Sequence, residues 1–292
     1  MLNPSRIYFA IYPVLNLSDM KKALVIGINS YPDPNKLFGC VNDAGGICGL
    51  LTNSLAFTNG DINLLTDGQA TKVKILEGLQ WLVRGATAND QLLFYFSGHG
   101  SQMVLADPVT GQKNIHDVLC PVDIDWTPAT CLSDLDFQSV FSALPNGVEC
   151  IWVADACYSG GLLPFARRSR EGRKKAITPP QKIREEISLV MEDHPNAVTK
   201  DILGSPLHLA LMAACAASEE AQDCYQAVNC NSLFTYFLLQ RLNDPGGLQR
   251  SLRDLITDIT TVISNTPFIQ TPQLKGNSTI AQKPFLETMI GS

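Results

Sequence analysis

Two glycine-rich segments hold the residues best suited to chemistry. His99 stands in the segment SGHG, and Cys157 stands in the segment DACYSGG. A thiol is a weak nucleophile until a base removes its proton, and an imidazole can pass that proton on to a leaving amine. The flanking glycines Gly98, Gly100 and Gly160 allow a substrate backbone to approach closely. A lone cysteine would more often serve packing and a lone histidine would be weak evidence, but together they predict a cysteine nucleophile with a histidine base.

Both segments follow apolar runs that have the character of buried strands. Hydrophobicity without alternation is typical of a parallel sheet covered on both faces. The sequence predicts strands at 23–29, 62–65, 91–97, 118–121 and 150–155, and helices at 41–51, 72–84 and 135–144. This alternation indicates an α/β fold with a doubly wound sheet. Ligands bind beyond the carboxyl ends of such strands, so His99 and Cys157 are expected to meet in one crevice.

A second block of elements follows a long basic connection. We expect a strand at 207–215 and helices at 233–242 and 248–263. Six of the nine residues from 167 to 175 are basic, and an amphipathic stretch at 182–191 follows Pro179 and Pro180. A charge run is often only a solvated surface. Long connections inside compact domains are uncommon, however, and tend to be functional or disordered.

The composition excludes several classes of protein. The chain has 292 residues, of which 45% are hydrophobic and 17% charged, and its formal net charge is −6. These values exclude a disordered, collagen-like or coiled-coil protein. They also disfavour nucleic acid as a partner, because neutralising phosphates requires a surplus of Lys and Arg.

The N-terminus and the cysteines bear on the compartment. Arg6 precedes an apolar run at 7–15, as in a secretory leader, which leaves secretion as an alternative. Pro13 interrupts that run, no small-x-small cleavage site follows, and no stretch is long enough to span a membrane. The nine cysteines form no CxxC pair and are odd in number, which favours mostly buried, reduced thiols. We therefore expect a cytoplasmic protein with no membrane partner.

Four motifs together resemble one family. The segments YFSGHGSQ and DACYSGG, with GCVNDA at 39–44 and QTPQLKG at 270–276, resemble the metacaspases and their bacterial relatives, the orthocaspases. The histidine also precedes the cysteine by roughly the spacing seen in caspases. The resemblance implies the caspase-haemoglobinase fold, a mostly parallel sheet sandwiched between helices. It also implies a cysteine endopeptidase that cleaves after Arg or Lys.

The resemblance assigns roles to individual residues. Cys157 would be the nucleophile and His99 the general base and acid, with a thioester acyl-enzyme as intermediate. The backbone N–H groups of Gly100 and Cys157 would form the oxyanion hole, where fixed donors stabilise developing negative charge.

Two carboxylates suggest the basis of specificity. Asp155 lies two residues before the nucleophile, and Asp43 lies in GCVNDA. A buried carboxylate pair is costly unless a cation compensates it, and a substrate Arg or Lys supplies one. By resemblance, Cys40 and Ser97 line the same pocket. The alternatives are that Asp43 caps a helix and that Asp155 orients a neighbour.

Calcium regulation is the point where the sequence departs from the family. Many metacaspases are switched on by calcium through four acidic side chains, and Asp123 and Asp134 match two of them. Leu135 and Pro164 stand at the other two positions, although a calcium ion prefers six to eight oxygen ligands. No cofactor is therefore expected to be required, unless a shifted alignment recruits Asp125 and Asp136.

The family pattern also divides the chain. Residues 1–20 would be an N-terminal extension and residues 21–292 a single peptidase domain. Within it, 21–163 resembles a large subunit, 164–205 is the basic connecting loop, and 206–292 resembles a small subunit. Exposed, extended segments are preferred sites of cleavage. We expect a monomer that acts on protein or peptide substrates and cuts itself after one of six residues, which are Arg167, Arg168, Arg170, Arg173, Lys174 and Lys175.

Two other functions remain open. A catalytically silent caspase-like adaptor would bind a partner without cleaving it, but it would have no use for Cys157, His99 and two pocket aspartates. A flavodoxin-like binder of small molecules would need a phosphate-binding glycine loop after its first strand. Gly27 is followed there by Ile28 and Asn29, which does not give GxGxxG.

Overall fold

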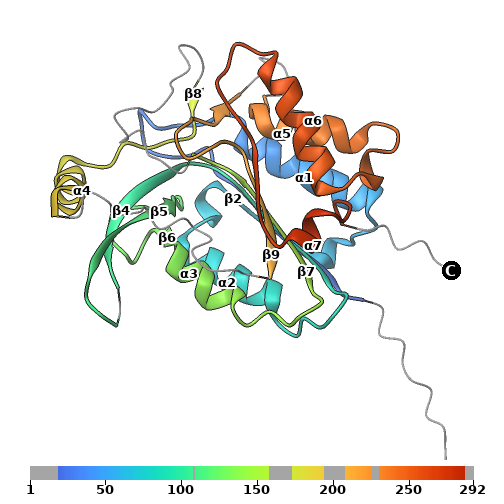
Figure 1. The fold of residues 1–292 in the computed structure, drawn as a ribbon, viewed down its shortest axis with the longest axis horizontal. Coiled ribbons are helices and arrows are strands. Elements are labelled where there is room, and N and C mark those ends of the chain that lie inside the picture. Colours follow the sequence, from blue (N-terminus) through green and yellow to red (C-terminus); the bar gives the residue numbers. More distant parts are fainter. Residues whose placement is uncertain (1–18, 108, 158–172, 194–207, 225–229, 287–292) are drawn as a thin grey trace, which may run out of the picture.

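A twisted six-stranded sheet forms the centre of the molecule. The computed structural model describes residues 19–107, 109–157, 173–193, 208–224 and 230–286 (Figure 1). From one edge to the other, the strands are β11 (Gln273–Gly276), β9 (Leu209–Ala213), β7 (Glu149–Asp155), β3 (Gln91–Ser97), β1 (Lys21–Gly27) and β2 (Ile62–Thr66). Only β11 runs antiparallel to its neighbour in this sheet. The prediction of a mostly parallel sheet is confirmed.

The sheet is buried on both faces, which explains why its strands show no alternation. In β3, Phe94 and Phe96 belong to one core, whereas Leu93 and Tyr95 belong to the other. Trp152 of β7 extends the first core, where its ring centroid lies 5.2 Å from that of Phe94. Replacing such a buried aromatic side chain by Ala costs about 3–5 kcal/mol.

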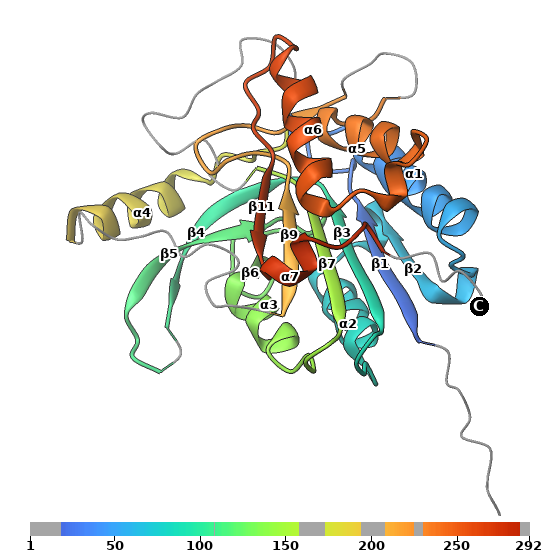
Figure 2. The ribbon, with the colours of Figure 1, turned by 45° about the vertical axis from the view of Figure 1, so that its right-hand side comes forward.

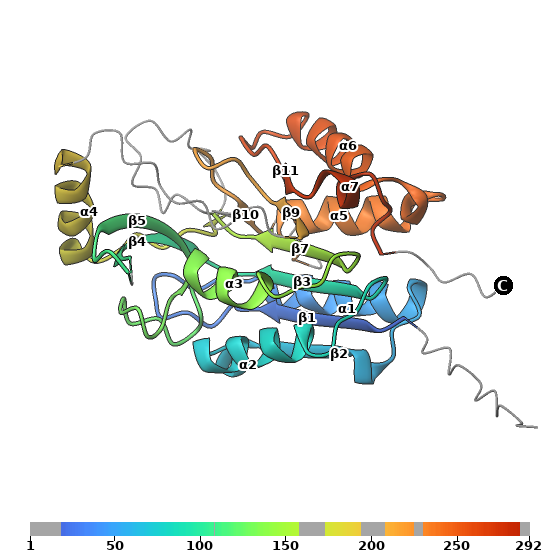
Figure 3. The same cartoon turned by 60° about the horizontal axis from the view of Figure 1, so that its bottom comes forward.

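Helices cover the two faces of the sheet. On one face lie α2 (Lys72–Val83) and α3 (Asp134–Phe141). On the other lie α1 (Cys40–Ser54), α5 (Leu233–Asn243), α6 (Leu252–Ser264) and α7 (Ser278–Ala281), as Figure 3 shows. Short polar side chains start several helices, as where Thr71 accepts a hydrogen bond from the N–H of Lys74. The last predicted helix begins later than expected, at Leu252, because Ser251 caps it.

One predicted strand belongs elsewhere. The run 118–121 was expected in the parallel sheet, but Val118 and Leu119 end a strand of a separate antiparallel sheet. That sheet consists of β4 (Gly100–Ala106), β5 (Lys113–Leu119) and β6 (Leu132–Ser133). A short apolar run does not reveal which sheet it joins, and Val118 is buried here against residues of α4 (Gln181–Asp193). Figure 2 shows α4 beside the β4–β5 ribbon.

The predicted connecting loop contains regular structure. Its described part, 173–193, includes the short strand β8 (Arg173–Lys174) and helix α4, which contains the predicted amphipathic stretch. Strand β8 pairs with β10 (Gln222–Asp223) in an antiparallel two-stranded sheet. Residues 1–18, 158–172 and 194–207 lie outside the described residues. No helix of the described chain has the length and apolar character needed to cross a membrane.

Candidate active site

The two predicted reactive segments leave the sheet side by side. Strands β3 and β7 are neighbours, and their last residues, Ser97 and Asp155, are paired in the parallel register. The N–H of Gly98 donates to the carbonyl oxygen of Asp155 at 3.3 Å, just beyond the strand ends. His99 and Cys157 therefore follow adjacent strand ends at the same edge of the sheet.

His99 is held in one orientation. Its Nε2 lies 2.7 Å from the carbonyl oxygen of Asn35, to which only a protonated nitrogen can donate. The Tyr31 ring lies against it at 4.6 Å between centroids, and the Tyr31 hydroxyl accepts the N–H of His99 at 3.1 Å. Burial lowers the pKa of His99 to about 4. The imidazole is thus neutral near pH 7, with Nδ1 as its basic nitrogen and no hydrogen-bond partner for it among the described residues.

Cys157 is fully buried, and its sulfur is hydrogen-bonded to residues other than His99. Its Sγ accepts the N–H of Ala221 at 3.0 Å. The Cys215 thiol interacts with the same sulfur, and this contact and burial raise the pKa of Cys215. Within the part of the chain that is described, no hydrogen bond joins Cys157 to His99. The segments meet as expected, but the two reactive groups share no hydrogen bond among the described residues.

One carbonyl oxygen occupies the position expected for an oxyanion. The N–H of Gly100 and the N–H of Cys157 both donate to the carbonyl oxygen of Lys175, at 3.0 and 3.2 Å. The backbones approach so closely that a Cβ added at Gly100 would lie 1.7 Å from the carbonyl oxygen of Cys157. Only glycine fits at this position. The two N–H groups assigned to the oxyanion hole therefore converge on one carbonyl of this chain.

The predicted acidic pocket contains the side chain of that same residue. Lys175 Nζ lies 2.9 Å from Asp155 Oδ1, 3.3 Å from Asp43 Oδ2 and 2.7 Å from Ser97 Oγ. All of these side chains are fully buried. Burial opposes the charge of Lys175, but attraction to Asp155, Cys40 and Asp43 outweighs it and raises the lysine pKa above its ordinary value. The predicted pocket residues are thus brought together around a cation.

Residues at the start of α5 hold the two carboxylates. The Ser232 hydroxyl oxygen lies within hydrogen-bond distance of both Asp43 and Asp155, so its one proton can be donated to either, and the Ser232 N–H donates to Asp43 Oδ1 at 3.0 Å. Asn231 Nδ2 adds a bond to Asp43 at 2.9 Å, and Thr235 Oγ1 adds one to Asp155 at 2.6 Å. Sequence reasoning missed these three residues. The segment NSLFT offered only the signal of a polar residue before a helix.

The alternative interpretation of Asp43 does not match its contacts. Helix α1 begins at Cys40 after Gly39, and its first N–H groups, those of Cys40 and Val41, donate to Asn29 Oδ1 and not to Asp43. The Asp43 carboxyl instead accepts the Ser97 hydroxyl at 2.7 Å. Its pKa is raised because burial disfavours the charge, an effect that Lys175 opposes. Cys40 is buried as well, and its side chain lies near enough to Lys175 and Ser97 to interact with both, at the pocket wall.

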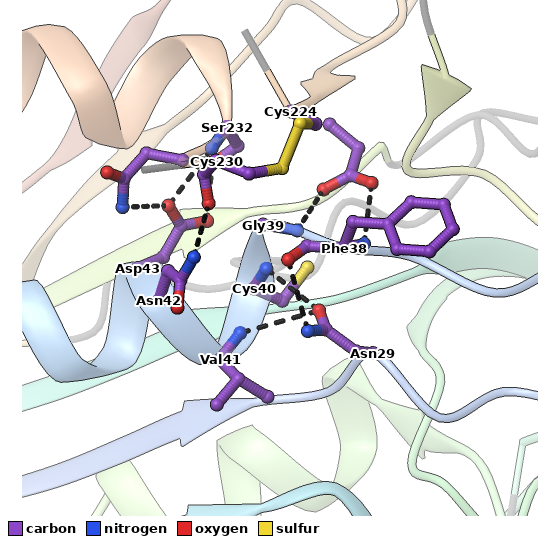
Figure 4. The surroundings of a disulfide bond; sticks show 12 residues. Asn29, Phe38, Gly39, Cys40, Val41, Asn42, Asp43, Cys224, Cys230 and Ser232 are labelled. Carbon is purple, nitrogen blue, oxygen red and sulfur yellow. Dashed lines mark hydrogen bonds between the residues drawn. A yellow bond between two sulfur atoms is a disulfide. The ribbon is translucent and has the colours of Figure 1, made fainter. Parts of the chain in front are cut away.

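A disulfide lies beside this pocket, in contrast to the expectation of reduced thiols. Cys224 is bonded to Cys230, as Figure 4 shows. The residue before it, Asp223, accepts the N–H groups of Phe38 and Gly39, each at 2.8 Å. The carbonyl oxygen of Cys230 accepts Asn42 Nδ2 at 3.0 Å. The expectation covered most of the cysteines and did not foresee this pair, because a spacing of six residues carries no signal of pairing. Six of the seven free cysteines are buried, and Cys48 is partly buried.

The candidate calcium ligands are engaged elsewhere. Asp123 Oδ1 accepts the N–H of Lys72 at 2.9 Å, and Asp134 Oδ1 lies 2.5 Å from His116 Nδ1. Of the alternative ligands, Asp125 accepts bonds from its own turn, and Asp136 accepts the N–H of Ser133 and the ammonium of Lys72. The described residues contain no group of three or more His, Cys, Asp or Glu able to hold a metal ion, and Pro164 lies outside them. The described carboxylates do not fit a calcium ion.

Comparison with known proteins identifies the family. The model of the metacaspase, peptidase C14 domain matches residues 21–166. Metacaspase-1 of Saccharomyces cerevisiae (strain YJM789) is 35% identical over 158 residues, which are 52% of this chain and 36% of that protein. Metacaspase-1 of Candida glabrata is 36% identical over 153 residues, which are 50% of this chain and 38% of that protein. The match spans little more than a third of the length of these relatives.

Solved structures confirm the fold. Protein GSU0716 of Geobacter sulfurreducens superposes with a TM-score of 0.65 at 18% identity, over 92% of this chain and 99% of that one. Caspase-1 of Spodoptera frugiperda superposes with a TM-score of 0.53 at 14% identity, over 88% of this chain and 86% of that one. The expected caspase-haemoglobinase fold is therefore present. With a metacaspase model matching half of its residues on this fold, the chain belongs to the metacaspase family.

Proposed function

We propose that the protein is a cysteine endopeptidase that cleaves protein substrates after Lys or Arg and cuts its own chain after Lys175. One observation carries the proposal. The Lys175 ammonium lies between Asp43 and Asp155 while its carbonyl oxygen accepts the N–H groups of Gly100 and Cys157. A residue about to be cleaved by such an enzyme would make both sets of contacts.

The contacts suggest a sequence of steps. The Cys157 sulfur, after giving its proton to His99 Nδ1, attacks the carbonyl carbon before the scissile bond. The two N–H groups hold the oxygen while negative charge develops on it. His99 then gives the proton to the leaving amine, which leaves a thioester on Cys157. A water molecule, deprotonated by the same imidazole, releases the carboxylic acid and restores the thiol.

The contacts of His99 and Cys157 show which rearrangement must precede the first chemical step. His99 already has its basic nitrogen free and its Nε2 fixed by Asn35. The Cys157 sulfur must exchange its bond from the N–H of Ala221 for contact with His99. Catalytic hydrogen bonds often form only in the substrate complex, so their absence beforehand does not argue against the assignment.

The choice of Lys175 narrows the six candidate cleavage positions. Lys174 and Arg173 make other contacts, and the remaining three candidates, Arg167, Arg168 and Arg170, lie outside the described residues. Intact-mass measurement of the freshly purified protein tests the choice. The parent should yield two fragments divided between Lys175 and Ala176, and Lys175→Arg should do the same. Neither Lys175→Ala nor Cys157→Ala should give that break. A parent that hydrolyses peptides while its chain stays whole would contradict self-cleavage.

The adaptor alternative keeps one argument, which is that no hydrogen bond joins Cys157 to His99 in the described chain. Fluorogenic peptides with Arg, Lys, Asp or Leu at the cleaved position separate the two functions. Hydrolysis of only the Arg and Lys peptides is expected for the endopeptidase. Hydrolysis of none of them by the parent would favour the adaptor.

The monomeric state also belongs to the proposal, whereas the cytoplasmic location expected from the sequence does not. The edge strand β11 has four residues and ends in exposed Lys275 and Gly276, and short, charged edges discourage pairing between chains. The Cys224–Cys230 disulfide weighs against a reducing compartment, where such bonds are rare. Size-exclusion chromatography with light scattering would test the first point.

A further inference from the structure

We propose that this site selects a run of basic residues and not only the cleaved one, with Glu220 recognising a Lys or Arg at the second position before the cut and Phe38 recognising one at the third. The inference rests on the proposed function, because it treats residues 173–175 as a substrate bound in the site. It adds two specificity-determining residues outside the pocket of Asp43 and Asp155.

The backbone around Lys175 is bound along its length as a strand. On one side β8 pairs with β10, and the N–H of Lys175 donates to the carbonyl oxygen of Ala221 at 3.0 Å. On the other side the N–H of Ile177 donates to the carbonyl oxygen of Gly100 at 3.2 Å. A peptide bound this way gains affinity from its main chain and specificity from the side-chain subsites. The side chains at 174 and 173 mark the second and third subsites.

Glu220 makes the second subsite. Its carboxylate Oε2 lies 2.6 Å from Lys174 Nζ, with the Glu220 side chain 5% and the Lys174 side chain 31% exposed. That buried oxygen has no hydrogen-bond partner among the described residues, so the lysine ammonium is the only group seen to neutralise it. A buried carboxylate without a cation is costly. When residues 173–175 leave the site, a substrate with a basic second residue would restore the neutralising charge.

Phe38 makes the third subsite. The guanidinium of Arg173 lies 4.6 Å from the centroid of the Phe38 ring, and its Nη1 donates to the carbonyl oxygen of Lys36 at 2.7 Å. Asp223 is paired with Arg173 in the strand register, and its carboxylate accepts the N–H of Phe38, which fixes the position of Phe38. Phe38 is 52% exposed, although a large apolar side chain normally avoids water. Binding of a cation by its ring would be a functional reason for this exposure.

An ordinary surface ion pair would not support this inference. The pair of Lys36 and Asp33, for example, has both side chains more than half exposed, and such pairs contribute little. Glu220 differs because its carboxylate is buried beside the bound strand, two residues before β10, and its one ion pair among the described residues is with Lys174. Its contact therefore depends on which residue occupies the position of Lys174.

The test uses the full chain and peptides with Lys at the cleaved position. The second position is varied among Lys, Leu and Glu, and the third between Arg and Ala. Lys over Leu at the second position should raise kcat/KM about tenfold, and Arg over Ala at the third should raise it about two- to fivefold. Glu at the second position should give the poorest substrate.

Variants assign these preferences to the two residues. Glu220→Gln should bring the ratio between second-position Lys and Leu close to one, and Glu220→Lys should favour second-position Glu. Phe38→Ala should remove the third-position preference alone. The matched control is Glu77→Gln, which removes an exposed charge on α2 and should leave every ratio as in the parent. Equal ratios in the parent and Glu220→Gln would overturn the assignment of the second subsite.

A second measurement does not depend on catalysis. In a full-length Cys157→Ala chain, hydrogen exchange of the backbone amides at 173–177 reports how firmly this segment is held. Adding Glu220→Gln should raise their exchange several-fold, and adding Glu77→Gln should not. Unchanged exchange would count against the subsite even if no peptide were cut. If peptides with Lys or Arg at the cleaved position are hydrolysed regardless of the second residue, the subsite proposal alone fails. If none is hydrolysed, the proposed function fails.

Discussion

The acidic pocket and the nucleophile region lie at the same sheet edge but differ in how far they are assembled. In the pocket, Asp43 and Asp155 are fully buried, bound by neighbouring hydroxyl groups and neutralised by Lys175. In the nucleophile region, His99 and Cys157 are each held by other partners and share no hydrogen bond in the described chain. In the proposed enzyme, the part that would bind a substrate is already assembled, whereas the part that would break a bond requires one local rearrangement.

The difference follows from the cost of burying charge. A buried carboxylate pair without a cation is unstable, so the pocket folds around one. The neutral imidazole and the buried thiol carry no such cost and can remain apart. The comparison predicts different effects for substitutions in the two regions. Substitutions in the nucleophile region should abolish hydrolysis, and substitutions in the pocket should change substrate selection.

The largest expected effect is the loss of the nucleophile. Cys157→Ala should lower peptide hydrolysis by about 10⁴-fold or more, and His99→Ala nearly as much, because the pair acts as a unit. Steady-state rates with Arg and Lys peptides measure both variants. Cys131→Ala, which removes a buried thiol elsewhere, is the control and should retain its rate. Substantial activity in Cys157→Ala would show that Cys157 is not the nucleophile.

The acidic pocket should affect substrate selection. Asp155→Asn and Asp43→Asn should each lower kcat/KM for Lys and Arg peptides thirtyfold or more, since leaving a buried charge without its partner costs about 2–5 kcal/mol. Asp258→Asn, at an ion pair on α6, should leave kcat/KM unchanged. If either pocket variant cleaves Arg peptides as well as the parent does, that carboxylate does not bind the substrate.

His99 should also make the folded state sensitive to acid. Its pKa is lowered by burial to about 4 in the folded chain, against 6.5 as the ordinary value, so the unfolded chain binds its proton first. The stability that this histidine contributes is complete above pH 6.5 and is lost as the pH falls toward 4. At pH 5 the parent should have lost about 2 kcal/mol more unfolding free energy than His99→Gln. Urea unfolding of both proteins at pH 7 and pH 5 measures the difference, and parallel losses would disprove the link.

The smallest expected effect is that of calcium. Because Asp123 and Asp134 are engaged with Lys72 and His116, chelation should leave measurable hydrolysis. Rates of the same preparation with a chelator and with millimolar calcium test this. An enzyme that is inert in chelator and recovers many-fold with calcium would show that these carboxylates rearrange.

The sequence predicted the sheet better than it predicted the site. Strands β1, β3 and β7 follow from continuous apolar runs, which only burial on both faces explains. The run at 118–121 was assigned to the wrong sheet, since periodicity does not reveal the neighbours of a short strand. The sequence does not single out Lys175 among the six basic candidates. The choice depends on which carbonyl oxygen accepts the N–H of Gly100, and that is a tertiary contact.

The supporting residues of the site left still weaker signals. Ser232 and Thr235 contact the two aspartates only because α5 begins beside the end of β7, a long-range arrangement without a local pattern. Glu220 is an ordinary acidic residue in the sequence, and only its burial together with its ion pair to Lys174 distinguishes it. Roles of this kind depend on tertiary contacts.

The disulfide in Figure 4 gives a thiol reductant two opposing effects on this protein. The Cys157 sulfur must be reduced to attack, as in any cysteine peptidase. The Cys224–Cys230 bond joins the segment of Asp223, which fixes Phe38, to the segment of Ser232, which holds Asp43. A mild reductant would preserve the nucleophile, whereas a strong one would also open this ring and loosen both binding segments. Activity is then expected to pass through a maximum as the reductant is raised, and a Cys224→Ser, Cys230→Ser chain would show only the rise.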